Sequence, residues 1–238
     1  EIEKSGHVAT LVLANPERKN AMGPEFWAEL PGVIASLDRD PDVRAVVVAA
    51  RGTAFSTGLD LMRMAAEIGP ALTEGGLAAD RYAFRNKIIE MRRGFDAIVA
   101  SNKPFVAAIH GWCIGGGLDL AAACDVRVAA RDAVFSLRET KIAIVAATGS
   151  LQRLEGVIPK GVLRELAFTG KDVDAARALT IGLVNHVYDT PEATLEGARL
   201  IAQEIADNAP LVVQGTKEVL RVGETHGEAA GLDFVATF

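Results

Sequence analysis

Cysteine and histidine are scarce in this sequence, which has two of the first and four of the second in 238 residues. Cys113 and Cys124 lie in apolar surroundings and form no C-x-x-C motif, so we expect neither a disulfide framework nor a redox site. The histidines are scattered without the spacing of metal ligands, and we therefore expect no metal. This cysteine usage favours a reducing, cytoplasmic setting.

Long apolar runs are also lacking. No stretch approaches the ~20 consecutive apolar residues of a membrane-spanning helix, and no basic segment followed by an apolar run marks a signal peptide. The formal net charge of −6 argues against a general surface for nucleic acid or anionic membranes. With 50% hydrophobic residues the composition is that of a globular chain, and the absence of an initial Met is consistent with a stretch of a longer one.

The stretch from Lys103 to Asp125 organises the chain. Residues 105–109 form a short apolar run that predicts a buried strand, and the apolar spacing after Gly117 predicts a helix. Three consecutive glycines, 115–117, leave backbone N–H groups unshielded at the helix N-terminus, where an anion is favoured. Asp119 then places a carboxylate in the first helical turn, close to these amides.

Two other interpretations of this turn stay open. A dinucleotide-binding turn could use Glu139, about 20 residues on, for a ribose, but Cys113 interrupts the G-x-G-x-x-G pattern that would begin at Gly111. Alternatively, the glycines only permit close packing and Asp119 only complements the helix dipole. Taken alone, the turn does not separate an anion site from a packing motif.

Strands and helices alternate up to about residue 190. Residues 67–76 contain glycines and a proline with little periodicity, which predicts a mobile surface loop. Residues 191–238 look helical, with breaks at Ala209-Pro210 and Gly223. We therefore predict an α/β core over 1–190 and a C-terminal helical region over 191–238. The patterns place strands at 7–13, 43–50, 105–109, 125–130, 133–137 and 183–188, and helices at 24–39, 80–100, 149–154 and 160–168.

A second glycine-containing turn, Arg51 to Leu61, leaves the predicted strand at 43–50. With both glycine turns placed, the chain resembles the crotonase family, the enoyl-CoA hydratases and isomerases. The matching segments run in order over nearly the whole chain: Asn15-Pro16, Asn20-Ala21-Met22, 55–60, 111–125, 133–139, Gly149, 151–154, 168–170, 182–184, Ala209-Pro210 and Lys217. The resemblance implies a crotonase-like fold of repeated ββα units with roughly perpendicular small sheets. It also implies C-terminal helices that drive homotrimers or hexamers, and a chain that continues past Phe238.

The resemblance further implies an acyl-CoA substrate, so that CoA enters with the substrate and no separate cofactor is expected. By the family pattern, the backbone amides of Leu59 and Gly116 form the oxyanion hole for the thioester oxygen. Deprotonating or adding to an acyl thioester builds negative charge on that oxygen, and each preorganised donor stabilises it by roughly 3 kcal/mol.

The two catalytic carboxylates of the family's hydratases fall on Asp119 and Glu139. Hydration of a conjugated double bond needs one group to activate water and one to protonate the α-carbon, and two carboxylates can divide that work. Asp at 119 matches the dienoyl-CoA isomerase subgroup, but the further Asp of that subgroup is Ala147 here. We therefore rank hydration of a 2-enoyl-CoA first and isomerisation of 3,5- to 2,4-dienoyl-CoA second. For Glu139, a surface ion pair with Arg138 or Lys141 is the alternative.

The resemblance also implies contacts to CoA. Arg18 and Lys19 lie in a loop expected near the nucleotide phosphates, Lys217 is expected to add a charge, and Ala54 and Thr57 are expected to shape the channel. Ordinary solvated charges are an equally open interpretation of the basic residues. A non-catalytic family member that binds acyl-CoA or RNA is a further alternative, although the net charge disfavours RNA and the two acids disfavour an inactive site.

Overall fold

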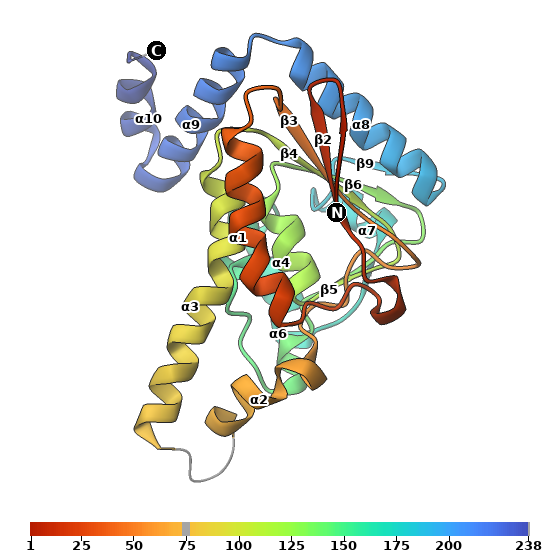
Figure 1. Ribbon diagram of the computed structural model, residues 1–238, viewed down its shortest axis with the longest axis vertical. Coiled ribbons are helices and arrows are strands. Elements are labelled where there is room, and N and C mark those ends of the chain that lie inside the picture. The colour runs from red at the N-terminus through yellow and green to blue at the C-terminus, as the bar shows by residue number, and fades with distance from the viewer. Residues whose placement is uncertain (73–76, 238) are drawn as a thin grey trace.

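The computed structural model describes residues 1–72 and 77–237, which are built around two β-sheets (Figure 1). The larger sheet has the strand order β1 (Ile2–Ser5), β2 (Val8–Leu13), β3 (Ala45–Ala50), β4 (Phe105–Ile109), β6 (Val126–Ala130) and β9 (His186–Tyr188). Only β1 pairs antiparallel in it. The smaller sheet has the order β5 (Trp112–Ile114), β7 (Val134–Ser136) and β8 (Val173–Asp174).

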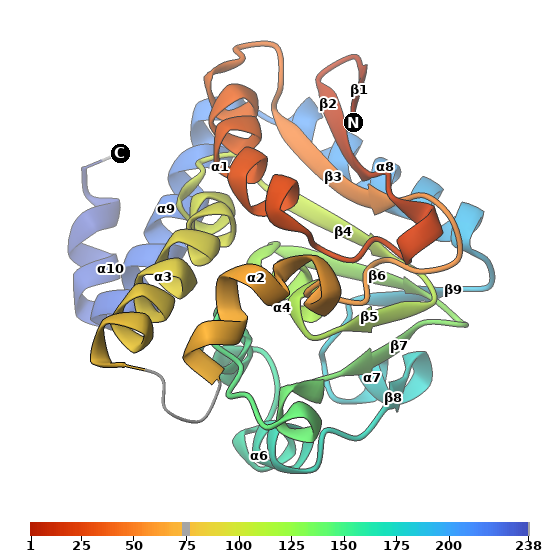
Figure 2. The ribbon, with the colours of Figure 1, turned by 60° about the horizontal axis from the view of Figure 1, so that its bottom comes forward.

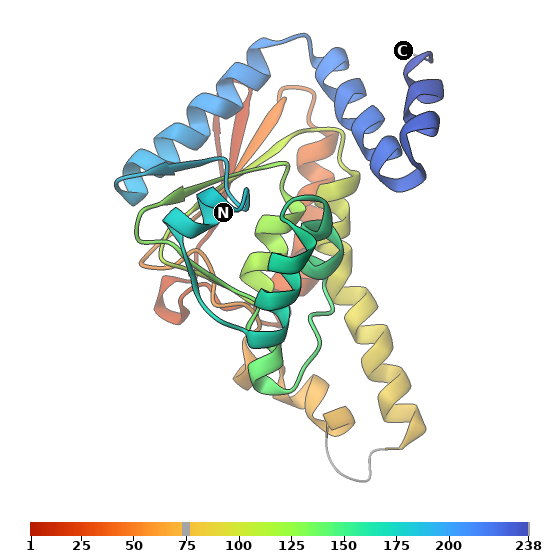
Figure 3. The ribbon, with the colours of Figure 1, turned by 180° about the vertical axis from the view of Figure 1, so that it is seen from behind.

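Helices lie on both faces of the larger sheet. The α-helices of the described residues are α1 (Pro24–Arg39), α2 (Leu61–Leu72), α3 (Ala78–Ala100), α4 (Gly116–Ala123), α5 (Ser150–Arg153), α6 (Lys160–Thr169), α7 (Ala175–Thr180), α8 (Pro191–Asp207), α9 (Pro210–His226) and α10 (Glu228–Val235). Figure 2 shows α1, α3 and α4 in front of the sheet, and Figure 3 shows α8 crossing its other face. The paired helices α9 and α10 extend beyond it.

The uninterrupted apolar sequence of β3 follows from burial on both faces. Val46 and Val48 pack into the core beneath α1, α3 and α4, whereas Val47 packs toward α8. On that side α8 presents Ala198 and Ala202, whose small side chains let the helix approach the sheet closely. The first glycine turn, which follows β3, therefore begins at the end of a strand that is buried on both faces.

Several predicted elements are confirmed, and three expectations need correction. The predicted surface loop at 67–76 is helical as far as residue 72, because Met64 and Ile68 are spaced one turn apart and both are buried in the core. Residues 73–76, the rest of that expectation, lie outside the described residues. The C-terminal break falls at Gly227 rather than Gly223, through which α9 continues. The three-residue strand β5 stands between β4 and the glycine turn, where the sequence predicted only a turn.

Candidate active site

Two glycine turns meet at the N-terminus of α4. Gly58 has a φ of +80°, and a Cβ atom there would lie 2.7 Å from the backbone nitrogen of Gly116. A Cβ atom at Gly117 would lie 2.5 Å from the carbonyl oxygen of Ser56. Any larger residue at these positions would push the turns apart, so the glycines bring two separate stretches of backbone into contact.

The contact brings together the two amides that the family pattern predicted. The nitrogen of Leu59 lies 3.6 Å from where a Cβ of Gly116 would be. Within the described parts of the chain, neither the Leu59 N–H nor the Gly116 N–H donates a hydrogen bond, although their neighbours do: Asp60 donates to Met22. Two adjacent N–H groups without acceptors, one of them at a helix N-terminus, suit an oxyanion.

Asn20 lies outside the first glycine turn and fixes its conformation through hydrogen bonds. Its backbone adopts a φ of +54°, which Asn tolerates, and its side chain is 4% exposed. The side-chain amide donates to the carbonyl oxygens of Arg51 and Ala54, while its backbone carbonyl accepts from Ser56 Oγ. The sequence marked Asn20 only as part of a family motif, since none of these partners is near it in the chain.

Glu139 lies beside the second turn, in a short 3-10 helix, Arg138–Ile142, that follows β7. Its Oε1 is 3.6 Å from the Cβ position of Gly115, and its buried Oε2 has no hydrogen-bond partner among the described residues. Burial raises the pKa of Glu139 to about 7, and the negative charge of Asp119 adds to the rise. Its carboxyl group can therefore gain and lose a proton near neutral pH.

The surface ion pair considered for Glu139 does not form with Arg138. That guanidinium binds Asp172 at 2.6 Å and lies 4.8 Å from the ring centre of Trp112. No ion pair to Glu139 occurs among residues 1–72 and 77–237. The carboxyl group is thus held beside the glycine turn without a compensating charge.

Asp119 has a different environment. It is 1% exposed, and both of its oxygens accept hydrogen bonds, one from Thr148 Oγ1 and one from the Ser150 backbone N–H at 2.7 Å. Burial raises the pKa of Asp119, while these hydrogen bonds and the charge of Arg153 oppose the rise. Its carboxylate is already bound to the protein, whereas Oε2 of Glu139 is not.

A cavity of about 360 Å³ opens beside Glu139. Apart from Glu139 and Thr140 its lining is apolar, as an acyl group requires: Leu137, Ala143, Ile144, Val145, Ala146, Leu151, Ala167 and Phe168. Ala147 directly follows this wall and is exposed. Its methyl group provides no acid at this end of the cavity.

The predicted CoA-binding residues fall into two places. Arg18 pairs with Asp60 at 3.0 Å, and the carbonyl oxygen of Lys19 accepts from the Thr57 N–H at 3.1 Å, so all three predicted contacts adjoin the first glycine turn. Ala54 is buried within that turn. These residues are positioned around the Leu59 amide, and their contact with CoA stays a prediction.

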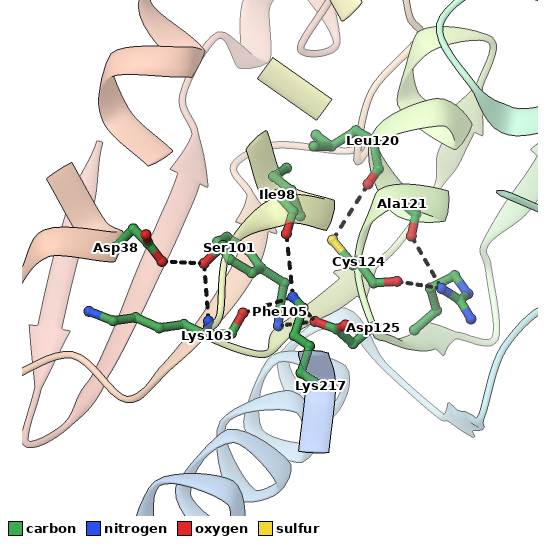
Figure 4. A network of polar contacts seen from close by, with 11 residues as sticks. Asp38, Ile98, Ser101, Lys103, Phe105, Leu120, Ala121, Cys124, Asp125 and Lys217 are labelled. Atoms are coloured by element: carbon green, nitrogen blue, oxygen red, sulfur yellow. Dashed lines mark hydrogen bonds and ion pairs between the residues drawn. The ribbon is translucent and has the colours of Figure 1, made fainter. Parts of the chain in front are cut away.

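Lys217 lies in a separate cluster, where α9 meets the end of α3 (Figure 4). Its Nζ donates to the carbonyl oxygens of Ile98 and Lys103 and to Asp125 Oδ2 at 2.8 Å. The side chain is only 11% exposed. Three acceptors therefore hold the ammonium group that the sequence assigned to CoA, and in this arrangement it fastens α9 to the core.

Comparison with known proteins places this geometry in context. The family model described as enoyl-CoA hydratase/isomerase matches residues 3–237.

The chain belongs to the enoyl-CoA hydratase/isomerase family.

It is 39% identical over 239 residues to the mitochondrial Delta(3,5)-Delta(2,4)-dienoyl-CoA isomerase of Dictyostelium discoideum, covering 99% of this chain and 80% of that protein. It is 37% identical to the (E)-benzylidenesuccinyl-CoA hydratase of Thauera aromatica, covering 94% and 82%. The crystal structure of an enoyl-CoA hydratase from Bacillus anthracis superposes with a TM-score of 0.89 at 29% identity, covering 100% and 88%. The crotonase-like fold and an enzyme of this family are therefore confirmed.

Other expectations from the resemblance stay predictions. The homotrimer or hexamer and the cytoplasmic setting belong to this group, and the Dictyostelium relative is named as mitochondrial. Among the described helices, none combines the length and the hydrophobicity that a membrane-spanning segment needs. In the described residues, no three His, Cys, Asp or Glu side chains gather as metal ligands would.

Burial raises the pKa of Cys124 to about 12 and that of Cys113 well above its usual value, so both stay protonated thiols.

Gly116→Pro tests the oxyanion hole. Gly116 is the first residue of α4, a position that accepts proline because its N–H has no intrahelical partner. We expect kcat to fall about 10²–10³-fold because one donor to the thioester oxygen is lost. Gly116→Ala is the matched control, since it adds a Cβ 3.1 Å from Met22 Sδ but keeps the amide. Equal activity of both variants would exclude the Gly116 amide as a donor.

Glu139→Gln tests the proton carrier. The amide cannot take or return a proton, so we expect kcat to fall about 10²–10⁴-fold with little change in the affinity for acyl-CoA. In the unmodified protein kcat/KM should rise with pH through about 7, as the carboxylate forms. Glu155→Gln, at an exposed ion pair with Lys160, is the control. Loss of binding at unchanged kcat would assign Glu139 a structural role.

The same variant should be more stable than the unmodified protein above neutral pH. The folded-state pKa of Glu139, about 7, exceeds its ordinary value of 4.5, so folding is favoured by the protonated form and loses stability as the pH rises between these values. Glu139→Gln removes that loss, which is about 3 kcal/mol. Urea unfolding at pH 5 and pH 8.5 measures it, and an equal effect at both pH values would contradict the shifted pKa.

Proposed function

We propose that this enzyme moves a double bond within an unsaturated acyl-CoA, with Glu139 as the single proton carrier. The observation that supports this most is the contrast between the two acids. Glu139 has a buried oxygen without a partner among the described residues and a pKa of about 7, whereas both oxygens of Asp119 already accept hydrogen bonds. One mobile proton is enough for an isomerisation.

The reaction would proceed through an enolate. The Glu139 carboxylate removes a proton from C2 of a 3-enoyl-CoA, and the electron pair moves onto the thioester oxygen, where the amides of Leu59 and Gly116 stabilise it. Protonated Glu139 then returns the proton to C4, and the double bond shifts to C2–C3. No water is consumed. A pKa near the working pH lets one group act as both base and acid.

The family relationship supports an isomerase. It does not imply that a 3,5-dienoyl-CoA is the preferred substrate. Several curated relatives are named Delta(3,5)-Delta(2,4)-dienoyl-CoA isomerase. Converting a 3,5-diene into a 2,4-diene removes a proton at C2 and adds one at C6, four carbons away. Ala147 supplies no acid for the distant end, so we propose that a 3-enoyl-CoA, whose two reacting carbons are closer, is the better substrate.

Hydration of a 2-enoyl-CoA is the second candidate. It is favoured by the electrostatic coupling of Asp119 to Glu139 and by relatives named as hydratases. The sequence alone ranked it first. It ranks second here because Thr148 and Ser150 occupy the oxygens of Asp119 that would have to hold a water.

Isotope transfer distinguishes the two candidates. A 3-enoyl-CoA carrying deuterium at C2 should yield a 2-enoyl-CoA with part of that deuterium at C4, because one carboxyl group carries it between the two carbons. Mass spectrometry of the product measures the transfer. Rapid formation of a 3-hydroxyacyl-CoA from a 2-enoyl-CoA, with no isomerisation of the 3-enoyl-CoA, would reverse the ranking.

Ala147→Asp should add activity on dienes. A carboxyl group at this exposed position avoids the cost of a buried charge and supplies the acid that the distant carbon needs. We expect at least a tenfold gain on a 3,5-dienoyl-CoA, followed by the absorbance of the conjugated 2,4-diene. Ala147→Asn, which cannot transfer a proton, is the control. Fast turnover of the diene by the unmodified protein would show that no acid at 147 is needed.

A further inference from the structure

A line of polar contacts leads from α3 to the oxyanion helix. Arg153, at the end of α5, donates from Nη1 to the carbonyl oxygen of Thr148 at 2.8 Å and from Nη2 to Asp96 Oδ1 at 2.7 Å. Asp96 belongs to α3. Thr148 in turn donates through its hydroxyl to Asp119, in the first turn of α4. The last contact ends three residues after the predicted oxyanion donor Gly116.

The turn at 148–150 is shaped around this arginine. Gly149 has a φ of +121°, and a Cβ atom there would lie 2.2 Å from Arg153 Nη1. Both the backbone conformation and the space occupied by the guanidinium therefore require glycine. The side chain of Arg153 is 16% exposed, so it is held within the protein rather than in solvent.

We infer that Arg153 is a positioning residue of this active site. By holding the 148–150 turn between α3 and α4, it fixes the two groups that donate to Asp119, and with them the first turn of α4. Asp119 then holds the site together and does not carry the proton. This inference rests on the proposed function only for its kinetic readout.

The same contacts set the charge around Glu139. Arg153 faces Asp96, Asp119 and Arg92, and its charge favours the ionised form of Asp119. Ionised Asp119 raises the pKa of Glu139. Without Arg153, the pKa of Asp119 rises further, so Asp119 carries less negative charge beside Glu139 and raises the pKa of Glu139 less. The titration midpoint of Glu139 should therefore move below about 7.

Arg153→Met tests the inference against Arg92→Met. Arg92 binds the other oxygen of the same Asp96, 2.8 Å away, but among the described residues it makes no hydrogen bond or ion pair to the 148–150 turn. For Arg153→Met we expect about a tenfold lower kcat on a 3-enoyl-CoA at nearly unchanged KM, because the reacting groups are displaced. The carboxyl of Glu139, followed by ¹³C NMR, should titrate at a lower pH. Arg92→Met should change neither value.

Two further variants separate geometry from charge. Arg153→Lys keeps the positive charge but cannot hold both partners, so kcat should stay low while the midpoint of Glu139 stays near 7. Thr148→Val removes one hydrogen bond to Asp119 and leaves Arg153 intact, so it should also lower kcat. If Arg153→Met does not fold, the kcat of Arg153→Lys, compared with that of Arg92→Met, tests the inference.

Certain results would overturn the inference. Arg153 serves stability alone if Arg153→Met lowers only the melting temperature, with kcat per folded molecule and the Glu139 midpoint unchanged. An unchanged kcat per folded molecule in Arg153→Lys leads to the same conclusion. Activity retained in Glu139→Gln would refute the proposed function instead. The NMR titration does not depend on the reaction, so it still reports on Arg153 in that case.

Discussion

The contact between two glycine turns is the constraint on which this site depends. Backbone from the stretch after β3 and backbone at the start of α4 approach so closely that a single Cβ at Gly58 would reach the Gly116 nitrogen. Burial of β3 on both faces and the hydrogen bonds of Asn20 hold one side, while the α4 helix holds the other. The approach leaves two amides without internal acceptors, so folding itself creates the electrostatic site.

The second constraint is that the two acids, Asp119 and Glu139, have different burial and different hydrogen-bond partners. Asp119 is almost fully buried and receives two hydrogen bonds, whereas Glu139 has lost water at Oε2 and gained no partner among the described residues. Such a group costs stability in its charged form, and that cost is what brings its pKa to the working range. In the proposed mechanism Asp119 therefore positions the first turn of α4, and Glu139 carries the proton. A motif that contains both acids does not show this difference.

The sequence predicted the parts of the site that depend on backbone. Three consecutive glycines before an apolar helix indicated exposed amides at the helix N-terminus. The family resemblance then named the amides of Leu59 and Gly116, and the structure brings these two together. The sequence could not predict side-chain partners contributed by distant segments. Lys217 is held by α3 and Asp125, and Asp119 is bound by a turn 29 residues later. Likewise, Met64 and Ile68 are the buried positions of α2 among the residues whose side chains are described, and two are too few to reveal a helix beside glycines and a proline.

The central claim is that two backbone amides hold the thioester oxygen, and the carbonyl stretch of a bound, unreactive saturated acyl-CoA tests it most directly. With ¹³C at the carbonyl, infrared difference spectra should show the stretch at a lower frequency than in solution, because two hydrogen bonds weaken the C=O bond. In Gly116→Pro the shift should be roughly halved, and in Glu139→Gln it should be unchanged. A bound thioester with the solution frequency, or one unaffected by Gly116→Pro, would contradict the account.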